Sequence, residues 1–131
     1  MMHKFLQNKL WRDKMPEIVR ARGSLVHIAS LNDEEYDKQL KIKLMEEMQE
    51  VCAATSQQEL IEELADVYEV IDALCALRKI SFTDVRDVQT KKRDERGGFY
   101  ERMFVTMTEH KPGSIGEQYC RAQPDKYPEI I

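Results

Sequence analysis

Glycine and proline are scarce in this chain of 131 residues, which contains only 5 of the former and 4 of the latter. So few turn-forming residues argue against a sandwich or barrel built from many short strands. No apolar run approaches the roughly 20 residues of a membrane-spanning helix, and the first twelve residues lack the apolar core of a signal peptide. These absences predict one soluble, cytoplasmic domain with no membrane partner.

Cysteine and histidine show no arrangement that is typical of a site. The cysteines, Cys52, Cys75 and Cys120, are scattered and form no C-x-x-C pair, so we expect reduced thiols. The histidines lack the mutual spacing of metal ligands, which argues against a histidine-ligated metal. The chain also has no glycine-rich phosphate loop, no Ser-His-Asp pattern and no G-x-G-x-x-G motif.

Charge is distributed unevenly behind a formal net charge of -4. Residues 33–69 carry twelve acids against three lysines, whereas basic residues gather in the first 22 residues and again at 91–96. A nucleic-acid backbone favours a continuous positive surface, so an acidic centre with basic flanks suits a metal-chelated polyphosphate better. We therefore expect no nucleic-acid partner. The alternative is that these charges only solvate exposed helices.

Three segments have helix-capping patterns, in which a polar residue precedes an acid by three positions: Asn32 and Glu35, Ser56 and Glu59, Ser81 and Asp84. They predict helices from 33 to about 54, from 57 to about 79 and from 82 to the glycine pair at 97–98. Connections of about two residues between them favour an antiparallel all-α bundle.

The two ends of the chain have weaker patterns. Pro16 suits an early helical position, which predicts a short helix that ends near Gly23. Residues 25–28 could be briefly extended. Residues 99–107 lack helical periodicity and could form a strand or an arm, and residues 108–131 are rich in proline and glycine, which is typical of an irregular tail.

Two carboxylate motifs repeat within the first two long predicted helices: Glu46-Glu47-x-x-Glu50 and Glu62-Glu63-x-x-Asp66. In both motifs, the acid at the second position falls inside the leucine-lined face of its helix, and the acid at the fifth position lies at the edge of that face. Like charges on such a face are costly to bury unless a cation lies between them. Oxygen ligands favour Mg²⁺, or Mn²⁺ in its place, over zinc.

The motifs therefore predict a divalent-metal site in which Glu47, Glu50, Glu63 and Asp66 converge when the two helices pack by their leucine faces. The alternative is a salt-bridged surface on which Lys43 or another base neutralises the acids.

These motifs resemble the MazG-like, all-α nucleoside triphosphate pyrophosphohydrolase superfamily, whose signature is E-E-x-x-E followed further along by E-x-x-D. The chain is also similar to the branch related to phosphoribosyl-ATP pyrophosphohydrolase, which opens with a phrase like NKLVRDKIPEII and closes its last helix with RGGF. Here residues 8–19 are NKLWRDKMPEIV and residues 96–99 are RGGF. The resemblance extends over about residues 8–104, so we predict a helical domain over 1–104 and a C-terminal extension or arm over 105–131.

The resemblance implies a Mg²⁺-dependent hydrolase that cleaves a nucleoside triphosphate between its α- and β-phosphates and releases pyrophosphate and a monophosphate. One candidate role is the clearance of non-standard nucleotides. It implies metal ligation by the four convergent acids, and an active site completed by oligomerisation, as a homodimer or a tetramer. Glu46 is a candidate to accept the proton of the attacking water, and Glu47 is the alternative.

Basic residues are expected to bind the phosphates: Arg12, Lys14, Lys92 and Arg96. The last two lie four positions apart on one helix face and could act together, although all four could instead be ordinary exposed charges. Trp11 could stack on a nucleobase or belong to the core. Two other functions stay open, a non-catalytic helical dimerisation or binding module and a phosphoribosyl-ATP pyrophosphohydrolase proper.

Overall fold

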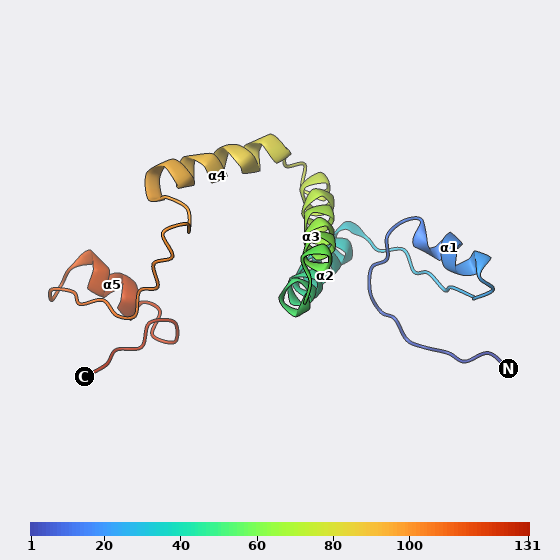
Figure 1. Cartoon of the computed structure of the whole chain (residues 1–131), viewed down its shortest axis with the longest axis horizontal. Helices are drawn as coiled ribbons and strands as arrows, with labels where there is room; N and C mark the ends of the chain where they lie inside the picture. Colours follow the sequence, from blue (N-terminus) through green and yellow to red (C-terminus); the bar gives the residue numbers. More distant parts are fainter. The chain divides into compact units, whose positions relative to one another are not determined.

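The computed structural model describes all 131 residues and contains helices but no strand (Figure 1). The helices are α1 (Met15–Ala21), α2 (Asp33–Ala53), α3 (Gln57–Leu77), α4 (Phe82–Arg96) and α5 (Ile115–Arg121). The predicted all-α class is confirmed, and the first four helices lie where the sequence patterns indicated them. None of the five has the length and hydropathy that crossing a bilayer would require.

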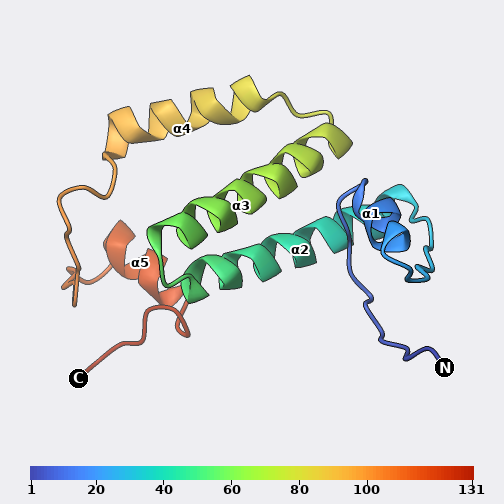
Figure 2. The same cartoon turned by 45° about the vertical axis from the view of Figure 1, so that its right-hand side comes forward.

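Helices α2 and α3 form an antiparallel hairpin and are the helix pair with extensive mutual contacts (Figure 2). Both begin at the predicted caps: the side chain of Asn32 accepts a hydrogen bond from the backbone N–H of Glu35, and Ser56 does the same for Glu59. Their buried hydrophobic residues are Leu40 and Val70, which are 3% and 8% exposed. The packed centre of the molecule is therefore this hairpin, joined by a short turn at residues 54–56.

An ion pair connects the start of α2 to the end of α3. Asp37 accepts hydrogen bonds from Nε of Arg78, the C-cap residue of α3, at 2.7 Å, and from Nζ of Lys41 at 2.8 Å. The hydrogen bonds from Arg78 and then Lys41 hold the pKa of Asp37 below its ordinary value, and the contact raises the pKa of Arg78. Because the two residues are 41 positions apart, this pair fixes how the helices are aligned.

Contacts divide the chain into two compact units, residues 1–92 and 93–131. Within the second unit, residues 99–107 adopt neither helix nor strand, and α5 follows. The sequence analysis did not predict α5, because seven residues between proline- and glycine-rich segments show no clear periodicity. A local signal was present nonetheless, since Ser114 accepts a hydrogen bond from the backbone N–H of Glu117, which is the same capping pattern as in α2 and α3.

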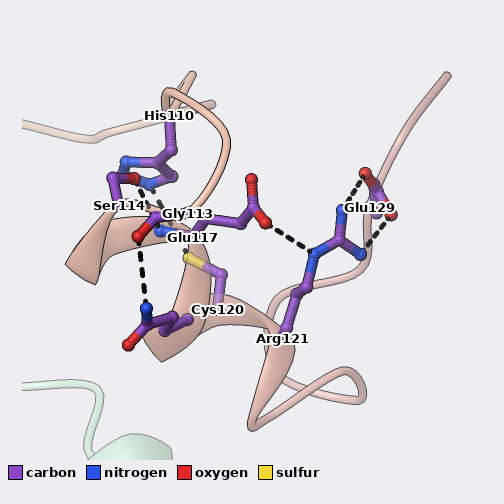
Figure 3. Close-up of polar contacts among 8 residues, drawn as sticks. His110, Gly113, Ser114, Glu117, Cys120, Arg121 and Glu129 are labelled. Carbon is purple, nitrogen blue, oxygen red and sulfur yellow. Dashed lines mark hydrogen bonds and ion pairs between the residues drawn. The ribbon is translucent and has the colours of Figure 1, made fainter.

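Side-chain contacts organise the second unit around α5 (Figure 3). Arg121 donates two hydrogen bonds to the carboxylate of Glu129, at 2.9 and 3.0 Å, which tie the end of the chain to the helix. The ring of His110 lies so close to Gly116 that any Cβ at that position would clash with it. These contacts lie within residues 110–129, inside the predicted extension over 105–131.

Replacing Asp37 with Asn is expected to lower the free energy of unfolding at neutral pH. The depressed pKa means that the stabilisation is present above the ordinary carboxyl pKa of 3.8 and is lost as the pH falls through the lower folded-state value. Urea unfolding of wild type and variant should therefore differ at pH 7, and the difference should shrink as the pH falls below 3.8. Glu34→Gln, which removes an exposed acid from the same helix end, is the control; an equal effect of both variants would contradict a specific role for the pair.

Candidate active site

The carboxylates of Glu47, Glu63 and Asp66 converge at the α2–α3 interface. Each offers an oxygen atom, and the three atoms lie within 4.8 Å of one another. Glu47 comes from α2 and is only 9% exposed, whereas Glu63 and Asp66 come from α3 and are half-buried. Three of the four predicted metal ligands therefore meet, because helical periodicity turns both motifs toward the facing helix.

Glu50, the fourth predicted ligand, is exposed and lies outside this cluster, which we call the acid cluster (Glu47, Glu63 and Asp66). Its charge still acts on the cluster. Desolvation raises the pKa of Glu63, and the negative charges of Asp66, Glu50, Glu47 and Glu62 raise it further. A carboxylate with a raised pKa among other acids is stabilised in its ionised form by an added cation.

The geometry of the acid cluster suits a hard divalent cation. Such an ion holds its oxygen ligands at about 2.0–2.6 Å, so its ligand atoms lie about 3–5 Å from one another. The three cluster oxygens satisfy this limit, and carboxylates are the ligands that Mg²⁺ and Mn²⁺ prefer. The donor set therefore fits the predicted type of ion.

The N-terminal segment, residues 7–15, reaches the acid cluster from a distant part of the sequence. Nη2 of Arg12 donates to Oδ1 of Asp66 at 2.6 Å, across a separation of 54 residues. Nζ of Lys9 donates to Oε1 of Glu46 at 3.2 Å, across 37 residues. Arg12 was predicted as a phosphate ligand, and the structure shows that its guanidinium already lies beside a candidate metal ligand.

Glu46 lies beside the acid cluster and is held by two lysines. It accepts hydrogen bonds from Lys9 and, at 3.3 Å, from Lys43, whose Nζ also lies 3.5 Å from Oε1 of Glu47. Partial desolvation acts to raise the pKa of Glu46, but the hydrogen bond from Lys9 and the charge of Lys43 outweigh it and lower that pKa overall. The ion pairs of Lys43, which the sequence offered as an alternative to a metal site, are thus present beside the acid cluster.

A hollow of about 400 Å³ lies where the N-terminal segment and α1 meet the acids. Its lining contains acids and bases from three parts of the chain: Lys9, Arg12, Lys43, Glu46, Glu47 and Asp66. It also contains the apolar side chains of Leu10, Trp11, Met15 and Val19, together with Gln7. The hollow therefore combines charged and apolar side chains next to a candidate metal site.

Of the other predicted phosphate ligands, Lys14 and Lys92 do not line this hollow. Lys14 is exposed and precedes α1 as its N-cap residue, and Lys92 is exposed on α4. Arg96 belongs to the second unit of the chain. Lys9 lines the hollow but was not among the predicted site residues. Its position near Arg12 in the NKLWRDK phrase was only a weak signal, because nothing local links it to Glu46.

A helical hairpin carrying E-E-x-x-E on one helix and E-x-x-D on the next defines the class of MazG-like all-helical proteins. Residues 24–93, just over half of the chain, match the family model described as phosphoribosyl-ATP pyrophosphohydrolase, and the chain belongs to this family. Membership implies a pyrophosphohydrolase, a hydrolase that acts on phosphoric anhydride bonds, of a kind that generally depends on a divalent metal.

An uncharacterized protein of Mycolicibacterium smegmatis is 41% identical to this chain over 54 residues, which cover 41% of this chain and 55% of that protein. The chain thus spans about half the length of this curated relative. No solved structure matches the chain. The family match includes the acid cluster but begins after the N-terminal segment, so Lys9, Trp11 and Arg12 lie outside it.

Glu63→Gln is expected to stabilise the metal-free protein at neutral pH while removing stabilisation by metal. A raised folded-state pKa means that the ionised group costs stability above that pKa, and a neutral amide relieves this cost. The difference from wild type should shrink below the ordinary carboxyl pKa of 4.5. Thermal unfolding with chelator and with Mn²⁺ provides the measurement. Glu69→Gln on the same helix is the control, and a less stable metal-free Glu63→Gln would refute the argument.

Arg12→Gln is expected to raise the affinity for Mn²⁺ in the absence of nucleotide. The guanidinium competes with a metal ion for Oδ1 of Asp66, so its removal frees a ligand oxygen and increases local negative charge. Isothermal titration should show tighter binding by roughly twofold to fivefold, the scale of a partly exposed ion pair. Arg20→Gln, which breaks an ion pair within α1, should bind Mn²⁺ as wild type does. Weaker binding by Arg12→Gln would show that Arg12 supports the acid cluster instead.

Proposed function

We propose that this protein is a Mg²⁺-dependent nucleoside triphosphate pyrophosphohydrolase that releases pyrophosphate and a nucleoside monophosphate. The observation that carries the proposal is the acid cluster, which lies in the family-matched hairpin and adjoins a hollow lined by three basic side chains. A nucleotide has matching parts, because its negatively charged polyphosphate pairs with cations and its base packs against apolar side chains.

In this proposal Glu47, Glu63 and Asp66 hold the ion, and Glu50 completes the set by rotating from its exposed position. A bound divalent ion supplies positive charge against the phosphates. Lys9, Arg12 and Lys43 neutralise the remaining phosphate charge from the lining of the hollow. Lys14 and Lys92, two of the other predicted phosphate ligands, do not belong to this lining, and neither they nor Arg96 have an assigned contact in the proposal. The acids thus bind metal, and the bases bind substrate.

Water attacks the α-phosphorus, the α–β anhydride bond breaks, and pyrophosphate leaves with the electron pair of that bond. We assign the role of proton acceptor to Glu46, because it lies beside the acid cluster without belonging to it and two lysines fix its carboxylate. Glu47 is the alternative acceptor, although metal ligation would occupy its oxygens.

Self-association accompanies this function in our proposal. The hairpin buries only Leu40 and Val70 among its hydrophobic residues. It leaves large apolar side chains exposed on both helices: Ile42, Met45, Met48, Leu60, Ile61, Leu64 and Tyr68. Apolar surface of this extent favours burial by a second copy, as a homodimer or within a tetramer.

Pyrophosphate release from a panel of standard and modified nucleoside triphosphates, with Mg²⁺ and with chelator, tests the proposal. We expect metal-dependent pyrophosphate without orthophosphate, and Glu47→Gln should lower kcat by about 10²-fold or more because it removes a metal ligand or the base. Glu69→Gln should retain wild-type activity. Orthophosphate as the product, or release unaffected by chelator, would refute the assigned reaction.

A phosphoribosyl-ATP pyrophosphohydrolase proper is the second candidate, and the family match itself favours it. Both activities need the same acids and release pyrophosphate, so the acid cluster does not separate them. Comparison of kcat/KM for phosphoribosyl-ATP and for nucleoside triphosphates in one assay distinguishes the two activities. A clear preference for phosphoribosyl-ATP would replace the first candidate by the second.

A further inference from the structure

We propose that the nucleobase of the substrate stacks on the ring of Trp11. Because stacking does not depend on the hydrogen-bonding groups of a base, the site accepts nucleotides with different bases. This inference rests on the proposed function and specifies its substrate class as nucleotides with varied bases. It concerns the apolar side chains that line the hollow, which take no part in the proposed binding of metal and phosphates.

The position of Trp11 follows from its neighbours in the chain. Lys9 and Arg12 are tied to Glu46 and Asp66, so the residues between them are held at the edge of the acid cluster. Trp11 is half-buried and lines the same hollow as both bases and both acids. A base lying against its ring would therefore have its phosphates close to the cations that line the same hollow.

The size and lining of the hollow fit such a ligand. Small-molecule sites have volumes of about 300–1,000 Å³ and combine apolar walls with a few polar groups, and this hollow of about 400 Å³ lies in that range. Leu10, Met15 and Val19 extend the apolar surface around Trp11. Base–aromatic stacking requires only a π face, which every nucleobase has, and is worth a tenfold or greater gain in affinity.

Base discrimination requires groups that pair with the base edge. The six charged side chains of the lining are engaged in the proposed metal, phosphate and proton-transfer roles, which leaves Gln7 as the one neutral polar side chain available to a base edge. Sites that hydrogen-bond a substrate reject analogues strongly, whereas stacking and apolar contact distinguish them weakly. The lining therefore favours tolerance toward altered bases over selection of one base.

Trp11 is the single tryptophan of the chain, so its fluorescence reports directly on this site. The protein with Mg²⁺ is titrated with the α,β-methylene analogues of ATP, GTP and CTP, which resist cleavage at the α–β bond, and with inorganic tripolyphosphate. We expect quenching by all three nucleotides, with Kd values within about tenfold of one another, and no quenching by tripolyphosphate. Absence of quenching by every nucleotide, or one nucleotide bound more than about 100-fold tighter, would overturn the proposal.

Variants separate stacking from a purely structural role. Calorimetric titration of Trp11→Ala should show nucleotide affinity reduced by about tenfold to 100-fold and tripolyphosphate affinity unchanged, and Trp11→Phe should restore most of the loss. Phe5→Ala, which removes an exposed aromatic ring that precedes the N-terminal segment and does not line the hollow, is the control. Equal losses for nucleotide and tripolyphosphate would show that Trp11 only anchors the segment, and would overturn the proposal.

Pyrophosphate release by the wild-type protein is measured in parallel. Quenching without metal-dependent release would refute the proposed function while base stacking is retained. Release that is equally efficient in Trp11→Ala would refute the stacking role while the function stands.

Discussion

Mutual repulsion of carboxylates at the α2–α3 interface is the constraint on which the rest of the site depends. Glu47, Glu63 and Asp66 are drawn together by the same helix packing that buries Leu40 and Val70. Burial and neighbouring charge raise the pKa of Glu63, so the hairpin carries an electrostatic cost that a cation can relieve. Only Leu40 and Val70 are buried hydrophobic residues, so positive charge near the acids is expected to stabilise the hairpin.

The chain supplies part of that charge itself. Arg12 and Lys43 contact the acid cluster directly, and Lys9 contacts Glu46 beside it. The hairpin that bears the acids lies in the family-matched region, whereas Lys9 and Arg12 precede it. In the function that we propose, the hairpin would supply the metal ligands, and the N-terminal segment would supply two of the three bases that contact the substrate. A change in that segment could then alter the substrate without altering the metal ligands.

Much of the fold could be predicted because its signals are local. Asn32 and Ser56 cap the helices that follow them. The side-chain oxygen of each accepts a hydrogen bond from the backbone N–H three residues further along, and this local contact does not depend on the rest of the chain. Helical periodicity likewise placed Glu47 in the interior. The seven residues of α5 were missed because periodicity needs a longer segment, and Lys9 was missed because nothing local links it to Glu46.

The sequence by itself determined the helices, the inward orientation of the two acid motifs and the similarity to one family, because each depends on spacing within a short segment. Only the tertiary structure decided which bases meet which acids, that Glu50 stays exposed while Asp66 is paired, and that Trp11 faces the same hollow as the acids. These relations join residues 37 to 54 positions apart. They depend on the path of the chain between α1 and α2, which no local pattern encodes.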